Sequence, residues 1–262
     1  MNSKRTLRVL LLMIMMGSPF AGYSQLWGVL QHLEIGGSAS FSSTTYNGSE
    51  RLYSETGIKT DSSLVFKTKT INPGMSVGGF VGTYFPVAHV GKRGALAISV
   101  AAVANMISWS KIADTTYGAY GNGITGTTLN TALPIGLDIK WGCEARQSRN
   151  YAICYTLGAG VYPSYSMTSI TDFANKTETN NVFNVNPYFK AEVGILAGIC
   201  IKLRAMYSLG NIQYINAMNK VDATTPGTFT LTGKNTMTVS LVIMPFSYTW
   251  KKYGWWNTAN KN

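Results

Sequence analysis

Charged residues and long apolar segments are both scarce in this chain. Asp, Glu, Lys and Arg make up only 13% of its 262 residues. After residue 25, no apolar stretch approaches the roughly 20 residues that a membrane-spanning helix requires. Apolar runs with helical periodicity are also absent. These absences argue against a helical membrane protein, and the length suits one domain or a small pair.

Cysteine is equally rare, with Cys143, Cys154 and Cys200 as the full set. They form no CxxC pair, and their odd number leaves at least one thiol free, so the sequence indicates neither a disulfide framework nor a metal site. Cys154 and Cys200 fall on predicted strands two apart. Such strands are separated by roughly 9–10 Å, too far for a disulfide without distortion.

Histidine is limited to His32 and His89, both predicted at the same rim of the fold. A Ser–His–acid arrangement at the opposite rim is therefore excluded. The two histidines and Glu34 could in principle hold a metal, but two ordinary rim histidines are the favoured interpretation. The Gly-rich run YGAYGNGITG at 117–126 has no Lys–Ser/Thr pair and no following helix. We therefore predict no enzyme, catalytic residue, metal or cofactor.

The N-terminus has the three-part layout of a secretory signal peptide. Lys4, Arg5 and Arg8 precede the apolar run 9–16, and small residues follow before Gln25. We predict a cleaved signal over 1–24 and one mature domain over 25–262. Export also argues against a nucleic-acid partner, although the formal net charge of the chain is +11.

The mature chain is rich in segments where large apolar residues recur at every second position, which is typical of strands. In 150–167, for example, Tyr151, Ile153, Tyr155 and Leu157 alternate with small or polar residues. The predicted strands are 33–43, 74–87, 94–110, 129–141, 150–167, 182–195, 199–210 and 228–250.

The predicted connections alternate between short and long. The short ones lie around 88–93, 143–149 and 197–198, and the long polar ones cover 44–73, 111–128, 168–181 and 211–227. This alternation is expected when one rim of a membrane barrel is periplasmic and the other faces outward. An open sheet edge cannot be hydrogen-bonded in hydrocarbon, so the sheet must close. The sequence predicts an all-β, closed antiparallel eight-stranded transmembrane barrel.

Over residues 33–250 the chain resembles the small eight-stranded outer-membrane barrels of the OmpA-transmembrane and OmpX type, and also the PorT-like barrels. The resemblance rests on strand pattern and loop parity. It implies an outer-membrane location in a Gram-negative-type bacterium and, from the PorT-like barrels, an accessory role in a secretion or assembly machine. Such barrels often end on an aromatic residue. Here Phe246, Tyr248 and Trp250 alternate as expected, but a tail over 251–262 continues beyond them.

Several charged residues occupy positions that the alternation turns into the barrel interior. In LPIGLDIKWG, Asp138 and Lys140 lie on the face opposite Leu137 and Ile139. The interior of an eight-stranded barrel is just wide enough for side chains to fill, so we predict an ion-pair network that closes the lumen. Its predicted members are Glu34, Asp138, Lys140, Lys190, Glu192, Lys202 and Arg204. A narrow small-solute channel is the alternative.

The predicted periplasmic rim is basic, since Glu144 is the only acid that we place there. Its predicted basic residues are Lys92, Arg93, Arg146, Arg149, Lys251 and Lys252. They would attract anionic head groups or, alternatively, an acidic periplasmic partner. Trp141, Trp250, Tyr253, Trp255 and Trp256 are the predicted interface aromatics. The expected role is structural or interactive, with outer-membrane lipid, lipopolysaccharide or another envelope or secretion-complex protein as partners.

Overall fold

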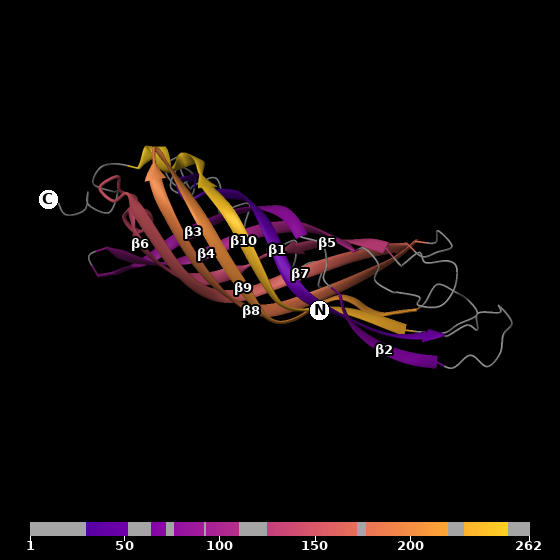
Figure 1. The fold of residues 1–262 in the computed structure, drawn as a ribbon. Coiled ribbons are helices and arrows are strands. Elements are labelled where there is room, and N and C mark those ends of the chain that lie inside the picture. Colours follow the sequence, from indigo (N-terminus) through magenta and orange to yellow (C-terminus); the bar gives the residue numbers. More distant parts are fainter. Residues whose placement is uncertain are drawn as a thin grey trace, which may run out of the picture.

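The computed structural model describes residues 30–51, 64–71, 76–91, 93–109, 125–171, 177–219 and 228–250. These residues form one antiparallel sheet that curls round and closes on itself (Figure 1). The predicted all-β barrel is therefore confirmed. The predicted signal peptide and the tail lie outside the described residues. None of the helices among the described residues is long and apolar enough to cross a membrane.

The wall consists of strands of 8 to 21 residues, and a short helix (α3) and a 3-10 turn (η1) lie at one end of it. The elements are β1 (Glu34–Arg51), β2 (Leu64–Ile71), β3 (Ser76–Val90), β4 (Gly94–Trp109), β5 (Thr125–Ala132), β6 (Ile135–Gly142), α3 (Cys143–Arg146), β7 (Ile153–Thr171), β8 (Thr177–Ala197), β9 (Ile199–Asn219), β10 (Thr228–Met244) and η1 (Pro245–Thr249).

Hydrogen bonds run in a ring through eight strand positions. β5 and β6 share one position, since each pairs with β4 on one side and β7 on the other. β2 pairs with β1 beyond the point where β3 begins. Pairing of β1 with β10, from Ile35–Ile243 to Gly48–Phe229, closes the ring.

The predicted strand 129–141 is interrupted at Leu133 and Pro134. Pro134 has no N–H group to give to a ladder, and the strand breaks at this position, although Pro163 and Pro187 lie within the unbroken strands β7 and β8. Neighbouring strands bridge the gap, because Ala101 N donates to Pro134 O at 3.1 Å and Leu133 N donates to Pro163 O at 2.9 Å. The wall therefore stays hydrogen-bonded across the interruption.

At one end of the barrel the strands continue further than the sequence predicts. The predicted loop 44–73 is wrong over much of its length, because β1 runs to Arg51 and the chain returns as β2. β7, β8 and β9 likewise extend into the predicted loops 168–181 and 211–227. β5 starts at Thr125, inside the predicted loop 111–128. We call this the projecting end; β2 marks it in Figure 1.

The opposite end, here called the short-turn end, carries the tight connections. Gly91 with positive φ lies between β3 and β4, α3 joins β6 to β7, and Gly198 with positive φ joins β8 to β9. These match the predicted short connections, although His89 belongs to β3 itself. The predicted strand 228–250 ends early, because Pro245 starts η1 directly after Met244.

The wall separates an apolar outer face from an interior that contains most of the charged and other polar side chains of the described strand residues. Along β8, Phe183, Val185, Phe189, Val193 and Ile195 point outward and expose between 46% and 66% of their surface. The residues between them, such as Asn184, Asn186, Lys190 and Glu192, are buried inside. Successive side chains of a strand point to opposite faces, so the alternation in the sequence becomes this inside–outside division.

Candidate functional site

A cluster of eight charged side chains crosses the lumen near the short-turn end. It contains all of the residues that the sequence predicts there, together with Glu144 from α3. Side-chain exposure within the cluster is at most 8%. The members are Glu34 from β1, Asp138 and Lys140 from β6, Glu144 from α3, Lys190 and Glu192 from β8, and Lys202 and Arg204 from β9.

Lys202 lies among three of the four carboxylates. Its Nζ is 2.5 Å from Glu34 Oε1, 3.0 Å from Glu144 Oε1 and 2.8 Å from Glu192 Oε2. These carboxylate oxygens lie within 4.8 Å of one another, a spacing that could suit a metal ion. The ammonium group of Lys202 already bonds to all three carboxylates, so it occupies the place that a metal ion would take.

Arg204 joins two of the same carboxylates with its planar guanidinium. Nε donates to Glu192 Oε1 at 2.6 Å, and a terminal nitrogen donates to Glu34 Oε2. The guanidinium lies 4.7 Å from the centre of the Phe80 ring. These charge-assisted bonds fix the two carboxylates on opposite sides of the β1–β10 seam.

Lys140 makes a second ion pair with Glu144, and Lys190 connects Asp138, the remaining acid, to the cluster. Lys140 Nζ is 2.5 Å from Glu144 Oε1 and lies 4.0 Å from the centre of the Tyr84 ring. Lys190 Nζ is 2.7 Å from Asp138 Oδ2 and also donates to Ser99 Oγ at 3.2 Å. Asp138 is thereby linked to β8.

Strand register sets these charges at one depth. Thr156 on β7 pairs with Lys140 on one side and with Glu192 on the other, and Glu192 pairs with Arg204. Glycine makes room beside Asp138, because a Cβ on Gly158 would lie 2.2 Å from Asp138 Oδ1. Seven of the eight charged residues thus come from inward positions of β1, β6, β8 and β9.

Glu144 lies in the lumen, so its predicted position on the periplasmic rim is wrong. The chain leaves β6 through Gly142, which has positive φ, and α3 turns the Glu144 side chain back into the lumen. Four cations then face four anions, so the cluster is formally neutral. The predicted set had four cations and three anions; the unneutralised charge was the signal that one acid was missing, because an unpaired buried charge costs several kcal/mol.

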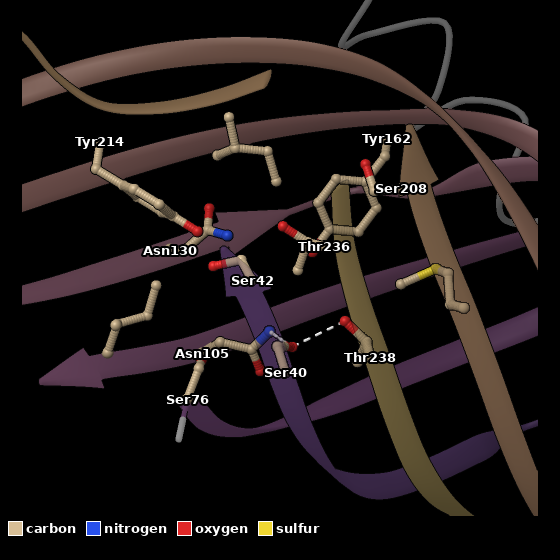
Figure 2. Close-up of a pocket in the computed structure, with 13 residues that line it drawn as sticks. Ser40, Ser42, Ser76, Asn105, Asn130, Tyr162, Ser208, Tyr214, Thr236 and Thr238 are labelled. Carbon is tan, nitrogen blue, oxygen red and sulfur yellow. Dashed lines mark hydrogen bonds between the residues drawn. The ribbon is translucent and has the colours of Figure 1, made fainter. Parts of the chain in front are cut away.

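On the projecting side of this cluster lies a small cavity (Figure 2). Both hydroxyl or amide groups and apolar side chains such as Ile107 and Met206 line it, and Ser40 Oγ and Thr238 Oγ1 are hydrogen-bonded at 2.8 Å. Asn105 Nδ2 donates to Ser40 Oγ at 3.4 Å, and Ser38 Oγ donates to Asn105 Oδ1 at 2.8 Å. This layer was not predicted from the sequence, because isolated serines on inward positions do not indicate a cavity.

Further towards the projecting end an apolar layer fills the interior. Trp109 and Tyr214 meet edge to face with 5.2 Å between ring centres. Trp109 Nε1 donates to Thr128 Oγ1 at 2.7 Å, and Thr128 Oγ1 lies 2.8 Å from Thr168 Oγ1. Packed with the two rings are Ile107, Ile170, Ile212, Ile215 and Leu231. This layer closes the lumen a second time.

A third layer lies at the short-turn end, where the three cysteines meet. Cys143, Cys154 and Cys200 are all free and buried, and they pack with Met244 and Trp250. A hydrogen bond to Cys154 and burial raise the pKa of the Cys143 thiol above its ordinary value. β7 and β9 are two strands apart, as predicted, but the sulfur atoms of Cys154 and Cys200 are only 3.8 Å apart.

The predicted interface aromatics separate into different environments. Trp250 is only 3% exposed and belongs to the cysteine layer, so its assignment as an interface anchor is wrong. The cause is η1, which turns the chain across the barrel end rather than along the wall. Trp141 is half-buried and pairs with the exposed Tyr155 at the end of β6. Tyr253, Trp255 and Trp256 lie outside the described residues.

The described part of the basic rim is engaged in local contacts. Arg146 donates to Gly91 O at 3.3 Å, and Arg149 donates to Tyr248 O at 2.5 Å. Arg93 lies over the Tyr151 ring, 5.7 Å from its centre. These arginines therefore fasten the short turns and η1 to one another. Lys92, Lys251 and Lys252 lie outside the described residues.

The histidines do not assemble a site within the described residues. His32 is buried against the Tyr84 ring with 4.5 Å between centres, whereas His89 is exposed near the end of β3. Among the described residues, the groups that could hold a metal consist of the three cysteines and of Glu34, Glu144 and Glu192. No histidine takes part in either.

No protein-family model matches the sequence, and no curated protein matches it. Among solved structures, the chain is similar to Ail, the attachment invasion locus protein of Yersinia pestis, in complex with the heparin analogue sucrose octasulfate. The identity is 11%, the alignment covers 81% of this chain and 98% of Ail, and the TM-score is 0.33. A second Ail structure gives a TM-score of 0.32 with the same coverage. Ail is a small eight-stranded outer-membrane barrel, and the likeness concerns the fold alone.

Proposed function

We propose that this protein is an exported outer-membrane barrel that conducts no solute and acts through binding at its projecting end. The observation that carries this proposal is the filled lumen. A cysteine layer, a neutral ion-pair cluster and an apolar layer follow one another along the barrel axis. Each layer is made of buried side chains, so the surfaces that remain accessible to a partner are the outer wall and the two ends.

The outer wall supports insertion into lipid. On β8 the outward positions from Phe183 to Ile195 are apolar and exposed. At 3.3 Å per residue and a tilt near 45° this stretch spans about 30 Å of membrane thickness, which matches the hydrocarbon core of a bilayer. An apolar band of this size is rare on monomeric soluble proteins. We propose outer-membrane lipid as its partner.

Beyond this band the wall becomes polar. At the projecting end, the outward positions of β8 are Thr177, Thr179 and Asn181. β1 and β2 continue there as a paired ribbon from Thr44–Ile71 to Arg51–Leu64. Among the described residues β2 pairs with β1 alone, so its other edge offers backbone groups to a further strand. We propose that another envelope protein, or lipopolysaccharide, binds at this projecting end.

The short-turn end would then face the periplasm. Arg93 and Arg149 are exposed there, and their charges remain available to anionic head groups while they fasten the turns. Attraction to anionic head groups requires no defined contact geometry, so we favour lipid over an acidic protein partner at this end.

Conductance tests the filled lumen directly. The purified protein is added to a planar lipid bilayer, where the proposal expects no current steps above the empty bilayer. Flotation of the protein with lipid vesicles on a density gradient serves as the positive control for insertion. Stable current steps from the wild-type protein, altered by Lys140→Ala, would establish the narrow channel instead.

The projecting end is tested by shortening its ribbon. Residues 49–66 are replaced by an Asn-Gly turn, which preserves the pairing of Gly48 with Lys67. Heat-dependent migration in SDS gels checks that the barrel still closes. The proposal expects the shortened protein to lose a partner that co-purifies in stoichiometric amount with the full chain. Equal recovery of the partner by both proteins would refute a role for the ribbon.

A further inference from the structure

We propose that Cys143, Cys154 and Cys200 form a binding site for a thiophilic d10 cation, Cu⁺ or Zn²⁺. The three residues come from α3, β7 and β9, so only the folded barrel brings them together. Their exposed fractions are 0%, 1% and 0%, and their sulfur atoms all lie within 4.8 Å of one another. Three convergent thiols form a soft ligand set that favours these ions.

The sulfur spacing suits a shared ion better than a disulfide. Ligands placed 2.3 Å from one metal are about 3.8 Å apart in a tetrahedral site and about 4.0 Å apart in a planar trigonal site. The Cys154 and Cys200 sulfur atoms are 3.8 Å apart. A disulfide needs about 2.05 Å between sulfurs and Cα atoms within about 7 Å, which is less than the roughly 9–10 Å between strands two apart.

Glycine on the intervening strand allows the approach. Gly194 on β8 pairs with Cys154 and with Lys202, between the two cysteine-bearing strands. A Cβ at this position would lie 2.9 Å from Cys154 Sγ. Without a side chain on Gly194, the Cys154 thiol leans across β8 towards Cys200.

In this proposal the surroundings supply a fourth ligand and a cover. Met244 is fully buried in the same layer, and its thioether is a soft ligand suited to Cu⁺. η1 covers the layer, since Cys200 N donates to Ser247 Oγ at 2.6 Å and Ser247 Oγ donates to Met244 O at 2.7 Å. Each coordinating thiol releases its proton as it binds, and the metal keeps its oxidation state.

The test uses the full chain, refolded in detergent under reducing conditions without metal. Cd²⁺, Zn²⁺ and Cu⁺ are each added before or after refolding. We expect one ion per chain, and with Cd²⁺ an ultraviolet thiolate charge-transfer band. Each of Cys143→Ser, Cys154→Ser and Cys200→Ser is expected to weaken binding at least tenfold, while Ser40→Ala leaves it unchanged. Met244→Leu is expected to weaken Cu⁺ more than Zn²⁺.

Folding of every variant is checked by heat-dependent migration in SDS gels. X-ray absorption of the loaded wild-type protein adds a measurement that needs no variant, and sulfur neighbours at about 2.3 Å are expected for Zn²⁺. Three reduced thiols with no bound ion under all loading conditions would overturn the proposal and leave the cysteines as buried packing residues. A disulfide between any two of them in protein extracted from cells would also overturn it.

Discussion

Lys140 and Glu144 form an ion pair across the junction of β6 and α3, with 2.5 Å between Nζ and Oε1. The pair joins the end of the wall to the interior, since Lys140 is an inward strand residue and Glu144 lies on the helix that follows. Lys202 bonds to the same Glu144 oxygen at 3.0 Å. Glu144 therefore anchors α3 to two cations of the cluster.

Substitution of Glu144 by a neutral residue would leave the lumen with a net positive charge. Glu144→Gln leaves four cations facing three anions, and loss of one partner of a buried pair typically costs about 3–5 kcal/mol. We expect the free energy of unfolding, measured with urea in detergent or vesicles, to fall by about that amount. The double variant Lys140→Met with Glu144→Leu restores neutrality and is expected to recover most of the loss. Equal stability of the single variant and the wild type would contradict the account of the cluster.

Gly158 is predicted to be intolerant of any side chain. In Gly158→Ala the new Cβ would lie 2.2 Å from Asp138 Oδ1, so Asp138 must move away from Lys190. Insertion of a methyl group into a packed interior typically costs about 1–3 kcal/mol. Gly37→Ala is the matched control, because the nearest atom to its Cβ would be 3.9 Å away. The midpoint of urea unfolding should fall for the first variant and stay within error for the second.

If the apolar band lies in lipid, the loss of stability caused by a charged substitution should depend on its depth in the membrane. Phe189 lies near the middle of the outward apolar run of β8, whereas Thr179 lies beyond it. Phe189→Arg is expected to destabilise the barrel in vesicles by about 2–4 kcal/mol, and Thr179→Arg by about 0–1 kcal/mol. Equal effects at the two positions, or a protein that stays monomeric in buffer without detergent, would contradict insertion into lipid.

Substitution of Trp250 is predicted to lower the stability of the barrel far more than substitution of Tyr248. Trp250 is 3% exposed and packs in the cysteine layer, whereas Tyr248 is 52% exposed. Trp250→Ala is expected to cost about 3–5 kcal/mol, the usual range for a buried aromatic residue. Tyr248→Ala should change the stability in detergent by less than 1 kcal/mol, a roughly neutral surface effect. If Trp250 instead acted as a membrane anchor, its variant would weaken stability in vesicles but not in detergent.

Much of the barrel was predictable because the strand period is two and one face meets an apolar medium. That rule assigned Asp138, Lys140, Lys190, Glu192, Lys202 and Arg204 to the interior, and all of them lie there. The rule works for these residues because a shift by one would place each charge on the outer wall.

The alternation rule failed for strand segments outside the apolar band and for residues outside the strands. Beyond the apolar band, the sequences of β1 and β9 resemble those of loops, because strand residues that do not face lipid need not be apolar. Glu144 and Trp250 lie in short helical turns, where strand parity no longer states which way a side chain points. The cysteine layer depends on the absence of a side chain at Gly194, forty residues from Cys154 along the chain. Such a relation follows only from strand register.

The bond from Lys202 to Glu34 joins residues 168 apart in the sequence. Glu34 belongs to the first strand of the ring and Lys202 to the second-last. A nascent chain therefore exposes Glu34 without its cations until almost all of the strands have been made. Contacts this distant along the chain form slowly. Closure of the barrel must therefore follow synthesis of β9 and β10, and neutralisation of Glu34 belongs to the last stage, when the first and last strands meet.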